Sequence, residues 1–227
     1  MSTEKIKAIA CGLAVLVFGA LTACNSKPQN AALAKREQAM QALGACIAKL
    51  NPQCKVLVLS NPFIKDSGYL DDQSQYERAG LRGLRKGLGK QIPVTVVPPE
   101  IRAQYYTDRQ SLIFPPDCST PLSFAIEPAS VDQLAEAHSD CRVIVSLIGL
   151  PSGVEQLKLW DAKSPQSFAL LLPDMRVLGP PAKAVEGFQG GKLLAAVVQD
   201  ATTGEPLIVT RENVEAVLAS QPKALGY

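Results

Sequence analysis

The sequence is poor in the side chains that most often carry metal-dependent and acid–base chemistry. Its 227 residues include one histidine, His138, and one tryptophan, and aromatic residues make up 5% of the chain. Six cysteines are present, but no two of them form a Cys-x-x-Cys pair. Structural zinc sites use four Cys or His ligands at short, regular spacings. The composition therefore argues against a zinc site and against histidine-based catalysis.

Strong net charge of either sign is also missing. Lys and Arg number 23 and Asp and Glu number 21, which gives a net charge of +2. A nucleic-acid partner calls for a clearly basic face, and no run of like charges is long enough to form an interaction tail. We therefore expect no nucleic-acid partner.

Two familiar ligand-binding patterns are absent as well. Asp71-Asp72 lacks the Asp-x-Asp-x-Asp-Gly alternation of a calcium loop, so we expect both carboxylates to be solvated. Gly80, Gly83 and Gly87 do not have the G-x-G-x-x-G spacing, and they stand inside a predicted helix rather than before one. Because glycine is unfavourable in a helix, these three residues indicate a close approach of that helix to a sheet. We predict no cofactor and no metal.

The longest apolar run near the N-terminus is too short to cross a membrane. It extends from Ala8 to Leu21, whereas a spanning helix needs about 20 apolar residues. Lys5 and Lys7 precede this run and small residues follow it, which is typical of a secretory signal peptide. The run ends in Leu21-Thr22-Ala23-Cys24.

This ending resembles the lipobox of bacterial lipoproteins. The resemblance implies that residues 1–23 are removed and that Cys24 becomes an acylated N-terminus, carrying palmitate or similar chains. Two or more acyl chains hold a protein on a membrane durably, whereas one chain binds only marginally. Asn25 stands where Asp would favour the inner membrane in that family, which favours the outer membrane here. An ordinary signal peptide with an incidental cysteine is the alternative.

Three segments follow from this interpretation. Residues 1–23 are the signal peptide, residues 24–30 hold the lipidated cysteine and a short tether, and residues 31–227 form a single periplasmic domain. A chain of about 200 residues is long enough to bury one sizeable core.

Four cysteines remain in that domain, and an even number in an oxidising compartment favours disulfides. Cys46, Cys54, Cys118 and Cys141 allow three pairings. We favour Cys46–Cys54, which joins a helix end to the following strand, and Cys118–Cys141, which ties a Pro-rich loop to a strand. Closing a loop of some 20 residues contributes roughly 3 kcal/mol in the chain-entropy model. A metal site is the alternative.

Strand-like and helix-like patterns alternate along the domain. Apolar, β-rich runs predict strands at 56–59, 93–99, 141–151 and 167–174 and a hairpin at 192–200 and 205–210. Amphipathic periodicity predicts helices at 30–50, 74–90, 130–140 and 211–220, of which Ser130 and Thr210 cap the last two. This alternation indicates an α/β fold with a mostly parallel, Rossmann-like three-layer sheet and a C-terminal antiparallel hairpin plus helix. Residues 99–127 give no clear pattern.

The N-terminal helix has an apolar face that calls for a partner. We expect it to pack on its own domain. A coiled coil is the alternative, but Arg36 stands where its seam needs an apolar residue.

Residues 55–160 resemble one lobe of the type I periplasmic binding proteins, above all the sugar-binding group. The likeness rests on the strand Val56–Leu59, the turn Asn61-Pro62-Phe63, the helix that ends in Leu88-Gly89, and the strand Val94–Val97. That family has two lobes with the ligand between them, whereas this domain has room for one.

Candidate binding residues follow the ends of three predicted strands. In open parallel sheets, ligands bind beyond the carboxyl ends of strands, at a switch in strand order. Asn61 and Phe63, Ser152, and Asp174 occupy these places. The family resemblance extends to Asn61 and Phe63, and implies that the phenyl ring stacks on a sugar. A simple Asn-Pro turn and a core phenylalanine are the alternatives.

Three functions remain open at this point. The first, which we favour, is a lipid-anchored binding or scaffold module that holds an envelope protein partner and is not an enzyme. The second is a solute-binding lipoprotein for a sugar-like molecule. An enzyme is the third and least favoured, because His138 is accounted for by a helix C-terminus and a triad built from its chain neighbours is not expected.

Overall fold

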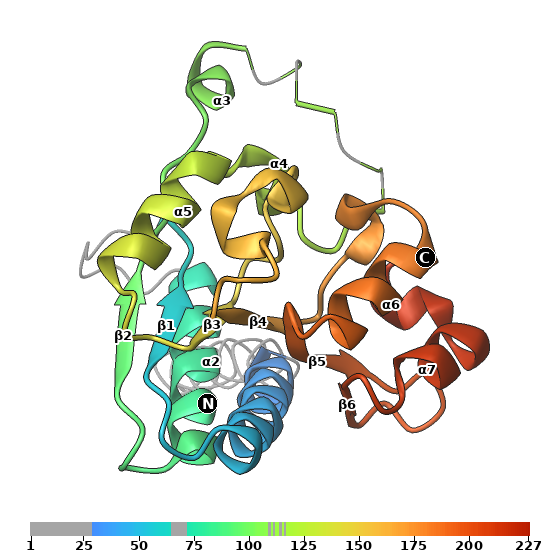
Figure 1. Ribbon diagram of the computed structural model, residues 1–227. Helices are drawn as coiled ribbons and strands as arrows, with labels where there is room; N and C mark the ends of the chain where they lie inside the picture. Colours follow the sequence, from blue (N-terminus) through green and yellow to red (C-terminus); the bar gives the residue numbers. More distant parts are fainter. Residues whose placement is uncertain (1–28, 65–71, 109, 111, 114, 116) are drawn as a thin grey trace, which may run out of the picture. The chain divides into compact units, whose positions relative to one another are not determined.

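The computed structural model describes residues 29–64, 72–108, 110, 112–113, 115 and 117–227 (Figure 1). The predicted signal peptide, Cys24 and Asp71 lie outside these residues. The chain divides into two units, Met1–Lys35 and Arg36–Tyr227. Within the described ranges, no helix is both long and apolar enough to cross a membrane.

A six-stranded sheet forms the centre of the second unit. The strands are β1 (Val56–Leu59), β2 (Val94–Val97), β3 (Val143–Ser146), β4 (Ser167–Leu171), β5 (Leu193–Gln199) and β6 (Pro206–Val209). They lie in the order β2-β1-β3-β4-β5-β6. All neighbouring pairs are parallel except β5 and β6, which are antiparallel. The predicted α/β fold, with its mostly parallel sheet and its C-terminal hairpin, is confirmed.

Helices cover both faces of this sheet. They are residues 36–50 of the N-terminal helix at 29–50, α2 (Asp72–Leu88), α4 (Leu122–Ala125), α5 (Pro128–Ala137), α6 (Pro181–Gln189) and α7 (Val214–Ser220). The short helix α3 (Ala103–Thr107) buries none of its residues and stands apart from the sheet (Figure 1). Residues 36–50 and α2 share one core with the alternate residues Val56 and Val58 of β1. The predicted packing of the N-terminal helix on its own domain is therefore confirmed for residues 36–50.

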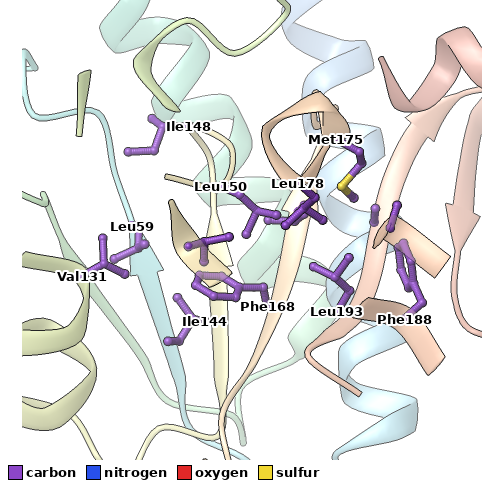
Figure 2. Packing of buried hydrophobic residues seen from close by; sticks show 14 of the residues in the cluster. Leu59, Val131, Ile144, Ile148, Leu150, Phe168, Met175, Leu178, Phe188 and Leu193 are labelled. Atoms are coloured by element: carbon purple, nitrogen blue, oxygen red, sulfur yellow. The ribbon is translucent and has the colours of Figure 1, made fainter. Parts of the chain in front are cut away.

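The opposite face carries the larger core. Leu57 and Leu59 of β1 belong to it, together with residues of α5, α6 and α7. Figure 2 shows its centre, where Phe168 of β4 and Phe188 of α6 are fully buried. Because all four residues of β1 are buried, this strand is covered on both faces, as a continuous apolar run predicts.

The glycines of α2 face a helix and not the sheet, so that prediction was wrong. A Cβ atom on Gly83 would lie 2.1 Å from the backbone oxygen of Glu37, and one on Gly87 would lie 2.1 Å from that of Gln41. Gly44 meets α2 from the other side, since its Cβ would lie 2.6 Å from the oxygen of Leu84. The glycines thus allow two helix backbones to touch.

Several helices differ from the sequence prediction. Helix α5 begins at Pro128, so that Ser130 lies in its first turn, where its hydroxyl donates to the oxygen of Glu127 at 2.8 Å. Helix α7 follows Asn213, whose side chain accepts from the amide of Thr210 at 2.8 Å. Helix α6 was not predicted at all, although a parallel β4–β5 pair requires a crossover element.

Neither predicted disulfide is formed, since all four described cysteines are free thiols. Cys141 precedes β3, whereas Cys118 lies beside Asp174, beyond the end of β4. These two cysteines therefore lie at opposite edges of a parallel sheet, some four residues or about 13 Å apart, and a disulfide needs Cα atoms within roughly 7 Å. Cys46 and Cys54 border the same core, Cys54 as a buried residue and Cys46 as a partly buried one, but they are not bonded to each other. Burial raises the pKa of the Cys54 and Cys141 thiols.

Candidate functional site

A pocket of about 540 Å³ lies where the strand order changes direction. The chain leaves β1 to form β2 on one side and then returns to form β3 on the other. The loops that follow β1 and β3 therefore diverge at the carboxyl edge of the sheet, which is the usual place for a ligand in such folds. Asn61 and Phe63 line the pocket from the first loop, and Leu147 and Ile148 line it from the second. We call this hollow the β1–β3 pocket.

Asn61 shapes the loop as well as lining the pocket. Its side-chain oxygen accepts a hydrogen bond from the amide of Phe63 at 2.9 Å, and its own amide donates to Oε1 of Glu77 at 3.3 Å. The first bond closes an Asx turn, which is the local geometry that Asn-Pro favours. The turn interpretation and the site interpretation of Asn61 therefore both hold.

Two aromatic rings form one wall of the pocket. The rings of Phe63 and Tyr105 lie 5.2 Å apart at 40°, and both residues line the pocket. Phe63 is half-buried, so it is not a core residue. Tyr105 comes from α3, which lies within residues 99–127, where we found no clear helix or strand pattern. Its only sequence signal was the pair Tyr105-Tyr106.

Two opposite charges line the same pocket. Glu77 is only 7% exposed, and its burial raises the pKa of the carboxyl group. Arg36 donates from Nε to the backbone oxygen of Tyr76 at 2.9 Å, and burial lowers the pKa of its guanidinium. The opposite charges of Arg36 and Glu77 attract each other, which partly offsets the effect of burial on both pKa values. Both residues are within the described part of the chain, yet they form no ion pair, so their charged atoms are more than 4.0 Å apart.

Further polar side chains complete the lining. Gln73 comes from the first turn of α2, while Ser119 and Thr120 come from the loop before α4. The sequence pointed to none of these three, because each is far along the chain from the Asn61 turn. The pocket thus combines aromatic faces, hydroxyl and amide groups, and one charge of each sign.

The other two predicted binding residues do not line this pocket. Ser152 accepts from Arg102 at 2.9 Å, and Arg102 also donates to the oxygen of Ile126 at 2.8 Å. Ser152 therefore holds one loop against another. Of the four candidates, the structure places Asn61 and Phe63 in the pocket and leaves Ser152 and Asp174 outside it.

Asp174 is buried and its carboxylate is saturated. It accepts three hydrogen bonds, all from Arg176. The donors are the backbone amide, Nε at 2.9 Å and a terminal guanidinium nitrogen at 2.6 Å. The thiol of Cys118 lies beside this carboxylate. Burial raises the pKa of Asp174, but these bonds outweigh it and leave the pKa below its ordinary value. Arg176 also pairs with Asp117 at 2.8 Å. The cluster ties the loop around Cys118 to the end of β4.

The remaining sequence candidates occupy unremarkable places. His138 follows the last residue of α5, as a helix-end role predicts. Asp72 begins α2. Across the described residues, no group of three or more His, Cys, Asp or Glu side chains is placed to hold a metal ion.

A second hollow of about 620 Å³ lies beyond the ends of β4 and β5. Leu172, Pro173 and Pro222 contribute to its lining, and Ser119 lines both hollows. Leu172 has a positive φ of 43° and is 41% exposed. Such a backbone conformation is uncommon for a residue other than glycine.

Comparison with known proteins gives matches only among solved structures. No protein-family model matches the chain, and no curated protein matches it. One similar structure is a carbohydrate transporter protein from Acidothermus cellulolyticus in complex with myo-inositol, with 16% identity, a TM-score of 0.47, and coverage of 84% of this chain and 62% of that one.

Two further structures show a similar level of likeness. A glucose-galactose binding protein from Geobacillus stearothermophilus has 11% identity, a TM-score of 0.47, and coverage of 78% and 61%. A sugar ABC transport substrate-binding protein from Bordetella parapertussis has 12% identity, a TM-score of 0.48, and coverage of 84% and 59%. The chain thus spans about three fifths of the length of the proteins it matches.

Proposed function

We propose that the protein binds a small polar solute of about the size of a sugar in the β1–β3 pocket. The observation that carries this proposal is the pairing of an aromatic wall, Phe63 and Tyr105, with polar side chains at the switch in strand order. A volume near 540 Å³ falls within the roughly 300–1,000 Å³ that is usual for small-molecule sites.

The lining suits a molecule with an apolar face and a polar rim. The rings of Phe63 and Tyr105 offer a flat surface for the C–H face of a small ring. Ser119, Thr120 and Gln73 offer hydroxyl and amide groups that fix orientation through hydrogen bonds. An open pocket at this edge favours solute binding over the scaffold function that the sequence alone favoured.

The proposal places this pocket in the cell envelope. Cys24 carries the acyl chains, the domain faces the periplasm, and the outer membrane is the favoured membrane. Replacement of Cys24 by Ala is expected to abolish metabolic labelling with fatty acid, because the thiol is the first acylated group. Labelling that persists in this variant would show that the protein is not a lipoprotein.

Ligand-induced stabilisation tests the binding function. A solute at about 100 times its dissociation constant adds roughly 2.7 kcal/mol to stability, which raises the melting temperature by about 2–4 °C per kcal/mol for a domain of this size. The mature full-length protein, purified in detergent, is melted with mono- and disaccharides, cyclic polyols and amino acids at millimolar concentration.

Matched variants decide whether the shift comes from this pocket. Phe63→Ala and Tyr105→Ala are expected to remove it, whereas Tyr106→Ala is the control, since Tyr106 is 67% exposed and does not line the pocket. A panel that gives no shift at all would overturn the proposed function.

A further inference from the structure

We propose that the solute is a zwitterion, whose ammonium group binds Glu77 and whose acidic group binds Arg36. This inference rests on the binding function proposed above and names the ligand class that the two charges of the β1–β3 pocket select.

Glu77 has one carboxylate oxygen available to a ligand. Its Oε1 accepts a single bond, from the amide of Asn61 at 3.3 Å, and Oε2 accepts none within the described part of the chain. No fully buried side-chain oxygen or nitrogen there is without a partner, so Oε2 keeps some accessible surface, and Glu77 lines the pocket. A nearly buried carboxylate with one long hydrogen bond is costly, and a ligand ammonium group would offset that cost.

The aromatic wall adds to the attraction for an ammonium group. Phe63 and Tyr105 line the pocket together with Glu77, and aromatic faces attract cations through their quadrupole. A carboxylate beside two rings is a common chemistry for binding amines. The same rings do not favour a carboxylate, so the acidic part of the solute must find another partner.

Arg36 provides that partner. Its Nε is bound to Tyr76, and its two terminal nitrogens form no hydrogen bond or ion pair with the described residues. A guanidinium group binds a carboxylate through two parallel hydrogen bonds. Because Arg36 and Glu77 are too far apart to pair directly, both charges remain free to bind groups of a ligand between them.

Other ligand classes leave one or both charges unmatched. A neutral solute that excluded water would leave Glu77 and Arg36 desolvated without a partner, which weakens binding. A ligand with only negative charge would be repelled by Glu77, and one with only positive charge would be repelled by Arg36. A molecule with one charge of each sign satisfies both.

Calorimetric titration of the mature full-length protein tests this inference. The probes are the twenty common amino acids, glucose and myo-inositol. For the amino acid that binds most tightly, its amide and its deaminated acid are titrated as well. Each of these single-charge analogues is expected to bind at least tenfold more weakly.

Variants assign each charge to its residue. Glu77→Gln is expected to reduce the affinity for the amino acid to that of its deaminated analogue. Arg36→Gln is expected to reduce it to that of the amide. Glu77→Asp and Arg36→Lys keep the charges and are expected to restore part of the affinity, so that a folding defect is distinguished from a lost charge. Glu136→Gln is the control, because Glu136 of α5 pairs with Lys158 and lies outside the pocket.

Two outcomes would overturn the inference, and only one of them would also overturn the proposed binding function. Glucose or myo-inositol that binds more tightly than every amino acid, with an affinity unchanged in Glu77→Gln, rejects the zwitterion and keeps the binding function. No binding by any probe rejects both.

Discussion

Glu77 and Asp174 are both buried carboxylates at the same edge of the sheet, yet they differ in their hydrogen bonding and in the direction of their pKa shifts. Asp174 accepts three bonds from Arg176, and its pKa is lowered. Glu77 accepts one bond from Asn61, and its pKa is raised. Exposure does not separate them, since they are 2% and 7% exposed.

The two carboxylates differ in how many hydrogen-bond donors the chain provides for them. Around Asp174 the chain supplies all of them, so this carboxylate fastens segments of the fold to one another. Around Glu77 the chain leaves bonding capacity unused beside a pocket, and perturbed carboxylates in such places are typical of functional sites. A buried acid thus indicates a binding site only where its bonding capacity is not already filled.

Replacement of Asp174 by Ala is the strongest way to break this comparison. It leaves Arg176 with Asp117 alone, so we expect a loss of about 3 kcal/mol in the free energy of unfolding, the low end for a broken buried pair. Urea denaturation measures this loss. Solute affinity at the β1–β3 pocket is expected to be unchanged.

A fall in affinity equal to that of Glu77→Gln would contradict the separation of the two roles. Asp174→Asn serves as the matched variant, since it keeps the volume of the side chain and some of its capacity to accept hydrogen bonds.

Replacement of Gly83 by Ala tests what holds Glu77 in place. The added Cβ would lie 2.1 Å from the backbone oxygen of Glu37, so α2 must move away from residues 36–50, at a cost of about 1–3 kcal/mol for overpacking. Glu77 and Arg36 lie on these two helices, and we therefore expect solute affinity to fall together with stability.

Gly80→Ala is the control for the stability part of this prediction only, because Arg36 belongs to the proposed site. Its Cβ would lie 3.3 Å from the Arg36 side chain, which is able to give way without separating the helices. Equal stability losses in the two variants would show that the helices are not held at a fixed distance.

The sheet could be predicted because its strands are encoded locally. Val56–Leu59 is a short apolar run that only a strand covered on both faces accommodates, and the Asn61-Pro62 turn marks its end. Helix α6 was missed because "PAKAVEGFQ" is short, contains a glycine, and has few large apolar residues. Its signals were Pro181 at the first turn and the Gly190-Gly191 pair that follows.

The pocket could be predicted only in part, for a physical reason. Asn61 and Phe63 are marked by their position directly after a strand. Arg36, Glu77 and Tyr105 converge on that turn from three different helices, and no local pattern encodes such a convergence. The cysteine pairing failed likewise, because proximity along the chain says little about which edge of a sheet Cys118 reaches.

The dependence of stability on pH sharpens the contrast between the two acids. The folded-state pKa of Asp174 lies below its ordinary value, so its contribution to stability is complete above the unfolded pKa and is lost as the pH falls through the folded pKa. Burial holds the folded-state pKa of Glu77 above its ordinary value. The charged Glu77 carboxylate therefore destabilises the folded protein at neutral pH, and this penalty is lost as the pH falls through the folded pKa to the unfolded pKa.

Glu77→Gln is accordingly expected to stabilise the protein without ligand at pH 7 and to have a smaller effect at pH 4. Urea denaturation at the two pH values measures the change. A variant that is less stable than the native protein by the same amount at both values would show that the carboxylate is satisfied within the fold, and the contrast with Asp174 would be lost.

Ser152→Ala is expected to have the smallest effect, and it separates proximity to a strand end from membership of the site. Arg102 keeps its bonds to the backbone oxygens of Ile126 and Ser152, so the variant loses one side-chain acceptor, at a cost of about 0.5–1.5 kcal/mol. Calorimetric titration is expected to give the native affinity. An affinity reduced tenfold would place Ser152 in the site after all, and would extend the β1–β3 pocket along the loop that follows β3.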